Sequence, residues 1–367
     1  MESDTANAIE SGVAQEPIED WEAYELNLDA RLGRDNKLQR SIAERARKRP
    51  MRVVFAEADH YRVLKAAEQA LEEGIAQPIL LGRRSVIEGL IEEHSLELNG
   101  AEVINPRSEE EFERRKAFGE EFFQLRMRHG LTAREGERLM RQRNYYGAMM
   151  VRTGRADALI SGLTRTYPSV IRPALQVIGK SDEVDKVAGM YILETKRGPM
   201  FFADTSVNVN PTAEEIASIA ALTAQAVRNL RIVPRIALLS YSNFGSAGGV
   251  DAKKMAEAAR ILKERHPDLI VDGEIQANFA LNDELLSESF PFSTLHNKRV
   301  NTLIFPNLAA GNIAYKLLQE MAGVEVQGPV LLGMRQSFHV LQMGSSVREI
   351  HDMVRLAVVD AQIKSNA

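Results

Sequence analysis

Short apolar runs with β-branched character alternate along the chain with longer segments whose apolar residues recur at helical spacing. This alternation is typical of βαβ units and predicts an α/β protein with mainly parallel sheets flanked by helices. Paired strands at 187–195 and 199–204 are expected around a turn at 196–198. The strands expected in the first sheet are 52–56, 78–82 and 158–162, and those of the second sheet are this pair together with 235–240 and 302–306.

The length of 367 residues suggests about two domains. A last strand is expected at 329–333, before a terminal helix from about Val347. Because this strand comes after the second sheet, we expect the chain to return to its first domain, which is then discontinuous. The first domain would comprise 36–175 with 328–367, and the second 176–327.

Composition narrows the class of protein. Apolar residues make up 44% of the chain and charged residues 26%, which are ordinary values for a globular protein. No apolar run approaches the roughly 18 residues of a membrane-spanning helix, so no membrane partner is expected. The absence of cysteine excludes disulfides, thiolate catalysis and sulfur-ligated metal sites. The acidic N-terminus lacks an apolar signal segment, and we therefore expect a cytoplasmic protein.

Charge is unevenly distributed. Residues 1–30 carry nine acidic and no basic side chains, so the net charge of −5 leaves +4 on the rest of the chain. Residues 126–155 hold eight arginines against two glutamates, which favours a small anionic, phosphorylated ligand. Without clustered lysines or a basic motif interleaved with aromatics, no nucleic acid is expected. Alternatively, Arg134, Arg138 and Arg141 share one helical face and are simply solvated surface.

The strongest local signal is a glycine-rich and hydroxyl-rich turn at 239–249, between an apolar strand and a helix that begins near Asp251. Backbone N–H groups at a helix start can hold phosphate or carboxylate, so this turn is a candidate anion cradle. Its spacing matches neither the lysine-containing phosphate loop nor the dinucleotide fingerprint. A well-capped βα turn without a ligand explains the same residues.

A second candidate site lies at 161–173, after an apolar strand, where ligands gather in open α/β sheets. Pro173 at a first helical position explains part of its geometry without a ligand. Residues 301–312 and 272–276 are a third and a fourth candidate, because each places polar groups beside glycine. The groups of the second candidate that suit phosphate or thioester oxygens belong to Thr164, Arg165, Thr166, Ser169 and Arg172.

Two other kinds of chemistry find no support in the sequence. The seven histidines show no spacing typical of a metal site, so no bound metal is expected. The chain also lacks a Gly-x-Ser-x-Gly motif, the commonest sequence signal of a serine hydrolase.

Six segments of the chain form a recognisable series: 157–162, 171–176, 238–247, 272–276, 305–316 and 328–333. In this order they resemble phosphotransacetylases, and the resemblance extends from about Asn36 to the C-terminus. It implies two α/β domains with a cleft between them that accepts coenzyme A, and a homodimer.

The acidic N-terminal residues resemble another family. Residues 11–20, with the apolar positions up to Leu28, look like the end of the catalytic part of large bacterial NADP-dependent malic enzymes, which carry a phosphotransacetylase-like domain at the C-terminus. Residues 242–246 are also more similar to those malic enzymes than to true phosphotransacetylases. This resemblance implies that 1–35 are a remnant of the catalytic part, that NADP and a divalent metal bind only in that missing part, and that the full-length enzyme forms a higher oligomer.

The chain departs from the family where acetyl transfer takes place. Active phosphotransacetylases carry Leu-Ser-Arg-Gly near the C-terminus and an Asp a few residues later, groups thought to activate the thiol and stabilise charge. The matching residues here include Gln342 and Met343, with Glu349 at the position of the acid; Asn278 and Asn307 also replace Asp. Loss of one well-aimed donor typically costs about 2.7 to 4 kcal/mol in the transition state. We therefore expect no catalytic residues in this chain.

Three arginines match positions in the family's active cleft: Arg62, Arg126 and Arg172. As a set they favour an anionic acyl-CoA ligand, although a structural ion pair explains any one of them. The residues that we expect to bind acetyl-CoA are Arg62, Arg126, Thr164, Arg165, Arg172, Ser240, Ser242, Asn243, Gly245, Ser246, Asn307, Asn312 and Gln342.

These features lead to three hypotheses. In the favoured one, acetyl-CoA is an effector: it binds the former catalytic cleft, is not turned over, and allosterically inhibits an attached malic enzyme that converts malate to pyruvate. In the second, the chain is an active phosphate acetyltransferase, which converts acetyl-CoA and phosphate to acetyl phosphate and CoA. In the third, the domain only holds copies of its enzyme together.

Overall fold

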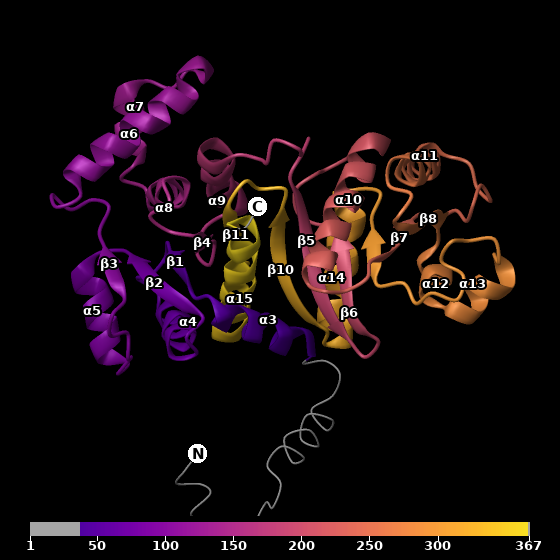
Figure 1. Ribbon diagram of the computed structural model, residues 1–367, viewed down its shortest axis with the longest axis horizontal. Coiled ribbons are helices and arrows are strands. Elements are labelled where there is room, and N and C mark those ends of the chain that lie inside the picture. Colours follow the sequence, from indigo (N-terminus) through magenta and orange to yellow (C-terminus); the bar gives the residue numbers. More distant parts are fainter. Residues whose placement is uncertain (1–36, 366–367) are drawn as a thin grey trace, which may run out of the picture. The chain divides into compact units, whose positions relative to one another are not determined.

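The first sheet consists of five parallel strands in the spatial order β11-β4-β1-β2-β3 (Figure 1). The computed structural model describes residues 37–365, so the predictions made for 1–35 lie outside the described residues. Strand interiors such as Val53, Val54 and Leu80 are fully buried, as expected for a parallel sheet with two covered faces. The strands are β1 (Met51–Phe55), β2 (Ala76–Leu81), β3 (Glu102–Ile104), β4 (Ala158–Ser161) and β11 (Ser337–Val340).

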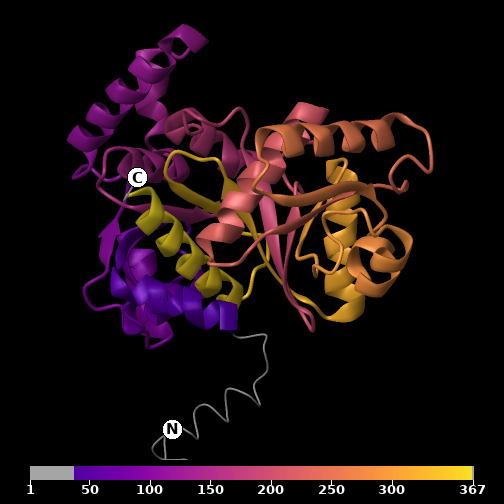
Figure 2. The same cartoon turned by 45° about the vertical axis from the view of Figure 1, so that its right-hand side comes forward.

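Helices flank this sheet. The terminal helix α15 (Val347–Lys364) packs on α4, β1, β4 and β11, because its buried residues Ile350, Val354 and Ala357 recur at helical spacing. Helix α3 lies beside α15 (Figure 2), where the Gln362 amide donates to three carbonyl oxygens of residues 45–49. The other helices are α3 (Lys37–Lys48), α4 (Tyr61–Glu72), α5 (Arg84–Glu93), α6 (Phe112–Arg126), α7 (Ala133–Leu139), α8 (Arg143–Arg152) and α9 (Tyr167–Pro173).

The second sheet has six strands in the order β10-β5-β6-β9-β7-β8. Strands β10, β5 and β6 pair antiparallel, whereas β6, β9, β7 and β8 pair parallel. The strands are β5 (Ala188–Thr195), β6 (Gly198–Ala203), β7 (Arg235–Leu239), β8 (Ile270–Ile275), β9 (Thr302–Ile304) and β10 (Glu325–Leu332). The accompanying helices are α10 (Ala213–Asn229), α11 (Val250–Arg265), α12 (Ala277–Leu281), α13 (Asp283–Ser289) and α14 (Leu308–Ala322).

The predicted α/β class with two sheets is confirmed, as are the antiparallel pair β5 and β6 and the start of α15 at Val347. The strand predicted at 329–333 occurs, but it is not the last strand and it does not join the first sheet. Residues 329–333 belong largely to β10, which pairs antiparallel with β5 in the second sheet. The chain re-enters the first sheet through β11, whose four residues give too short an apolar signal to be recognised. The domain boundaries themselves stay a prediction.

One helix prediction also differs from the structure. Pro173 closes α9 instead of opening a helix, because Pro168 already occupies the first turn and the chain continues into one turn of π-helix at Ala174–Ile178. The helical segment between β3 and β4 is divided into α6, α7 and α8. Its first break comes at Gly130, whose positive φ of 82° ends a short 3-10 turn.

Candidate functional site

A buried carboxylate holds the loop that follows β4. Glu57, two residues after β1, is 5% exposed. Its oxygens accept the backbone N–H groups of Gly162, Leu163 and Thr164 at 2.5, 2.8 and 2.9 Å, and also the Thr164 hydroxyl. Thr164 and Arg165 are exposed where this loop reaches the surface. The fixed backbone therefore presents two of the predicted ligand-binding side chains.

A second buried carboxylate holds the glycine-rich turn after β7. Glu274, in β8, is 3% exposed and accepts the Ser242 hydroxyl at 2.9 Å and the N–H of Gly245 at 2.6 Å. Gly245 has a φ of +89°, a conformation that favours glycine. Ser242 and Asn243 are buried, whereas Gly245 and Ser246 are exposed.

The backbone donors of this turn are already in use. Each N–H of residues 242–247 donates to an acceptor of the protein itself: the hydroxyls of Ser240, Ser246 and Ser242, the carbonyl of Asn243, and the carbonyl and carboxylate of Glu274. The N–H groups of residues 242–247 are therefore not free to cradle an external anion. The cradle at the helix start itself stays a prediction, because α11 begins only at Val250. What the turn can offer a ligand is the side chains that reach its surface.

A third buried carboxylate organises the loop after β6. Asp204, 3% exposed, accepts the backbone N–H groups of Ser206, Val207 and Asn208 at 2.9 to 3.1 Å, and that of Gly189 at 3.1 Å. The loop is thus tied to its own strand pair, β5 and β6. Its carbonyl at Thr205 in turn accepts the Asn312 amide at 3.4 Å, which brings one predicted ligand-binding residue to this loop.

The loop after β11, where the family carries its transfer chemistry, lies beside the loop after β4. The N–H of Leu341 donates to Ser161 at 2.7 Å, since β11 and β4 are neighbours in the sheet. Arg62, at the start of α4, donates to the carbonyls of Gly344 and Ser345 at 2.7 and 3.2 Å. Arg62 thus has a structural role, because its hydrogen bonds help to shape the loop after β11. Its positive charge lies beside that loop.

The two positions that depart from the family differ in exposure within this loop. Met343 is 70% exposed and carries no hydrogen-bond donor. Gln342 is half-buried, and its amide lies 3.5 Å from the carbonyl of Gly328 in β10. The first sheet and the second therefore meet at Gln342.

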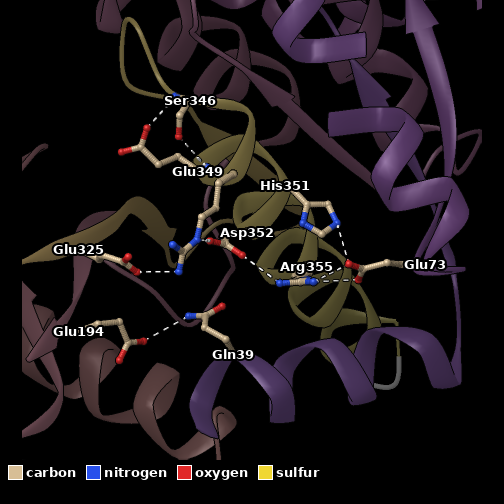
Figure 3. A network of polar contacts seen from close by, with 10 residues as sticks. Gln39, Glu73, Glu194, Glu325, Ser346, Glu349, His351, Asp352 and Arg355 are labelled. Carbon is tan, nitrogen blue, oxygen red and sulfur yellow. Dashed lines mark hydrogen bonds and ion pairs between the residues drawn. The ribbon is translucent and has the colours of Figure 1, made fainter. Parts of the chain in front are cut away.

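Glu349 is part of a helix cap (Figure 3). Its carboxylate accepts the N–H of Ser346 at 2.7 Å, and the Ser346 hydroxyl accepts the N–H of Glu349 at 3.2 Å. This reciprocal pair is a capping box that starts α15. The carboxylate is therefore engaged in holding the helix start.

Because of this cap, we expect Glu349→Ala to lower the free energy of unfolding by about 1 kcal/mol. Thermal or urea unfolding measures the change, and Glu349→Gln, which can keep the cap, serves as the matched control. A variant as stable as the parent chain would show that the cap contributes nothing.

A polar network continues along α15 beyond the cap (Figure 3). Two N–H groups of Arg355 donate to Glu73, at the end of α4, at 2.7 and 2.9 Å, and His351 Nε2 lies 3.6 Å from the same carboxylate. Arg348 donates to Glu325, at the start of β10, at 2.9 Å. The network thus joins α15 to the first sheet's helix α4 and to the second sheet.

His351 in this network makes stability depend on pH. Burial, with the positive charge of Arg355 nearby, lowers the pKa of His351 from 6.5 to about 4. The unfolded chain therefore takes up the proton first, so the stabilisation is complete above pH 6.5 and is lost progressively as the pH falls towards 4. Between pH 7 and pH 5 we expect a loss of about 2 kcal/mol in unfolding free energy that His351→Gln does not show. Urea unfolding of the parent chain and of His351→Gln at pH 7 and pH 5 measures this difference. An equal loss of unfolding free energy in the two proteins would contradict the role of His351.

Arg126 and Arg172 both act on the same tyrosine. Burial raises the pKa of the Tyr145 hydroxyl, and the charges of Arg172 and Arg126 oppose that rise. The Tyr145 hydroxyl donates to Gln176 at 2.6 Å, and Gln176 also lines a cavity of about 250 Å³ together with Arg126 and Arg138. Arg172 is exposed. Arg126 and Arg138 line this cavity together with the acid Glu135. Two guanidinium groups at one cavity are a suitable place for phosphate.

Not every arginine of the basic stretch is free for a ligand. Arg143 forms a two-bond pair with Asp59 at 2.5 and 2.7 Å, and this guanidinium, with help from Arg165, holds the pKa of Asp59 below its usual value. Arg152 pairs with Glu121 at 3.0 Å. Arg143 and Arg152 therefore support the fold.

Asn307 and Asn312 lie at a separate cavity of about 540 Å³, which Asn210 and Asp251 also line. Asn307 is the N-cap of α14, and its side chain accepts the N–H of Ala310 at 3.0 Å. Three asparagines and one aspartate line the cavity together with three apolar residues and no basic residue, so its polar groups suit amide or hydroxyl groups of a ligand better than its phosphates.

The predicted residues thus fall into local groups. One contains Arg62, Thr164 and Gln342, around the loops after β4 and β11. The others are the arginine cavity, the turn after β7 and the asparagine cavity. Glu57 and Asp204 were not predicted, and Glu274 was included in the candidate segment 272–276 without a role of its own, although an acid directly after or within a buried strand is a visible signal in the sequence. Among residues 37–365, no cluster of three or more metal-ligating side chains occurs, and no helix in this range is long and apolar enough to span a membrane.

Comparison with known proteins gives consistent matches. The family model of phosphate acetyl/butaryl transferases matches residues 37–358. An NADP-dependent malic enzyme of Salmonella typhimurium is 40% identical over 97% of this chain and 47% of its own length. A phosphate acetyltransferase of Clostridium acetobutylicum is 34% identical over 88% of this chain and 98% of its own length. A phosphotransacetylase structure from Streptococcus pyogenes superposes with a TM-score of 0.81 at 31% identity, covering 90% of this chain and 99% of that one.

The chain spans about half the length of the malic enzymes that it matches. The matched half is their C-terminal, phosphotransacetylase-like part. The resemblance to both families is therefore confirmed, and so is the fold that it implied.

Proposed function

We propose a function from the premise that this chain belongs to the phosphate acetyl/butaryl transferase family. The chain is a regulatory domain that binds acetyl-CoA and does not transfer its acetyl group. In a complete malic enzyme, the bound acetyl-CoA inhibits the oxidative decarboxylation of malate to pyruvate. This inhibition would be feedback by a downstream product, because the pyruvate that malic enzyme forms is converted to acetyl-CoA.

The arginines of the first sheet support retention of the ligand. The charges of Arg126 and Arg172 both lower the pKa of the Tyr145 hydroxyl, and Arg138 lines the same cavity as Arg126. We assign the phosphates of coenzyme A to these groups. Thr164, at the loop fixed by Glu57, and the asparagine cavity offer hydroxyl and amide partners for the less charged parts of the ligand.

The observation that best supports the absence of acetyl transfer is the composition of the loop after β11 and of the helix start that follows it. Met343 offers neither charge nor donor, and the carboxylate of Glu349 is engaged in the helix cap. A transferase needs a donor aimed at the developing oxyanion, and neither side chain supplies one. A second candidate, an active phosphate acetyltransferase, draws support from the 34% identity over nearly the whole length of such an enzyme.

Helix α14 supports assembly of the domain as a homodimer. Of its fifteen residues only Gly311 and Tyr315 are buried, while Ile313, Leu317 and Met321 are 57%, 52% and 82% exposed. These three recur at every fourth position and form one apolar stripe. A two-fold dimer brings the same stripe together from both copies, which buries it without any other partner. Higher oligomers of a complete enzyme, with NADP and a divalent metal in the catalytic part, belong to the same proposal.

Isothermal titration calorimetry of this chain with acetyl-CoA tests the binding. We expect saturable heat at one site per chain, with coenzyme A as the comparison ligand. Absence of heat at high ligand concentration would remove the sensor and leave assembly as the domain's role. Release of free thiol in the presence of phosphate, at the rate of an enzyme, would instead favour the transferase.

A further inference from the structure

Two buried glutamates, one in each sheet, are each surrounded by donors of a single site loop. Glu57 accepts three backbone N–H groups and one hydroxyl from the loop after β4. Glu274 accepts one N–H and one hydroxyl from the turn after β7, and its own backbone carbonyl accepts the N–H of Phe244. Within the part of the chain that the structure describes, neither carboxylate has an ion-pair partner at salt-bridge distance.

A carboxylate in such a place would ordinarily be paired with a cation. Burial without a cation is costly unless hydrogen bonds satisfy the charge, and here the loop supplies them. The reverse also holds. Without the Glu57 carboxylate, three backbone N–H groups of the loop after β4 would lose their acceptor, and without that of Glu274, one N–H and one buried hydroxyl of the turn after β7 would lose theirs. Each loop conformation therefore depends on one negative charge.

We propose that Glu57 and Glu274 are positioning residues that act as built-in anions, each fixing the loop that presents ligand-binding side chains. Glu57 orients Thr164 and Arg165, and Glu274 holds the turn at Gly245, which presents the side chain of Ser246. Neither glutamate is expected to touch the ligand. The proposal rests on the proposed function only for its effect on acetyl-CoA; the effect on the loops is independent of any ligand.

The chemistry of the side chain provides a specific test. Replacing Glu by Ala removes a CH₂ group and a carboxylate, which together correspond to acetate. If the loop needs only the anion, acetate from solution can enter the gap and accept the same N–H groups. A role in filling space alone would be met equally well by acetamide, which has the same shape and no charge.

The experiment uses Glu57→Ala and Glu274→Ala, with Glu68→Ala as the matched control. Glu68 is also a buried carboxylate, 2% exposed, and accepts the N–H of Glu97 at 2.7 Å, but it lies on α4 away from the site loops. Hydrogen exchange of the peptides that contain 162–164 and 242–247 is measured with and without acetate or acetamide. Acetyl-CoA affinity is measured by calorimetry under the same conditions.

We expect each site variant to exchange faster in its own loop, and to bind acetyl-CoA at least roughly tenfold more weakly. Acetate should restore both properties and acetamide neither, whereas the Glu68 variant should keep the protection of both loops and its affinity. Unchanged loop exchange in the site variants, or equal rescue by acetamide, would overturn the proposal. If a site variant does not fold, Glu57→Gln, which keeps the shape, must still expose residues 162–164 to exchange.

The two proposals fail separately in this experiment. If the parent chain binds no acetyl-CoA, the proposed function is wrong, and the exchange data alone decide whether Glu57 and Glu274 position the loops. If the parent chain binds acetyl-CoA and the exchange of the loops does not depend on the carboxylates, only the positioning role is wrong.

Discussion

Arg172→Glu is expected to weaken acetyl-CoA binding by roughly a hundredfold or more. Arg172 is exposed on α9 and acts, with Arg126, on Tyr145. Reversing its charge removes an attraction to the ligand's phosphates and adds a repulsion, and both effects oppose binding. Calorimetry with acetyl-CoA measures the loss, and the stability of the fold should change little because the side chain is solvated.

The matched control is Arg155→Glu. Arg155 is exposed like Arg172, but it precedes β4, at the opposite end of the strand from the site loop. Its reversal changes the net charge of the protein by the same amount and should leave the affinity nearly unchanged. Equal losses in the two variants would mean that only the overall charge matters. No loss in either would support a domain that merely assembles its enzyme.

The double variant Leu317→Asp/Met321→Asp is expected to convert the proposed homodimer to monomers, with association weakened roughly a thousandfold or more. Both side chains lie on the apolar stripe of α14 and are more than half exposed in the single chain. In a two-fold dimer each substitution occurs twice, so four carboxylates would be buried against apolar surface. Sedimentation equilibrium measures the change in association.

Val233→Asp serves as the control for this variant. Val233 is 59% exposed, comparable with Leu317, but it lies in the segment before β7 and not on α14. The control should remain a dimer. A double variant that remains dimeric would place the interface elsewhere, and a parent chain that is monomeric at all concentrations would remove the homodimer from the proposal.

Much of the fold was accessible from the sequence because buried parallel strands read as apolar runs. Strands β1, β2 and β4, and the pair β5 and β6, all occur within a few residues of their predicted positions. The point near the C-terminus where the chain passes from the second sheet back to the first could not be predicted from the sequence. The run in β10 is apolar on both faces and gives no information about which sheet it joins, and β11 contributes four residues only.

The positions where the candidate site differs from the family's motif could be predicted from the sequence better than the hydrogen bonds that hold the site together. Met343 and Gln342 could be recognised from the motif alone, and the spacing from Ser346 to Glu349 is itself a capping-box signature that points to a structural role. The anion cradle was predicted from local composition, which specifies N–H donors but not their acceptor. Glu274 lies twenty-nine residues from Gly245, and only the pairing of β7 with β8 brings the two together.

The central claim is that the site holds acetyl-CoA intact. Equilibrium dialysis of acetyl-labelled acetyl-CoA against this chain, in phosphate buffer, tests retention and turnover in one measurement when the label on the protein side is identified by chromatography. We predict that the protein side of the membrane holds more label than the other side, and that all of this label is still acetyl-CoA. Label recovered as acetyl phosphate, or distributed equally across the membrane, would contradict it.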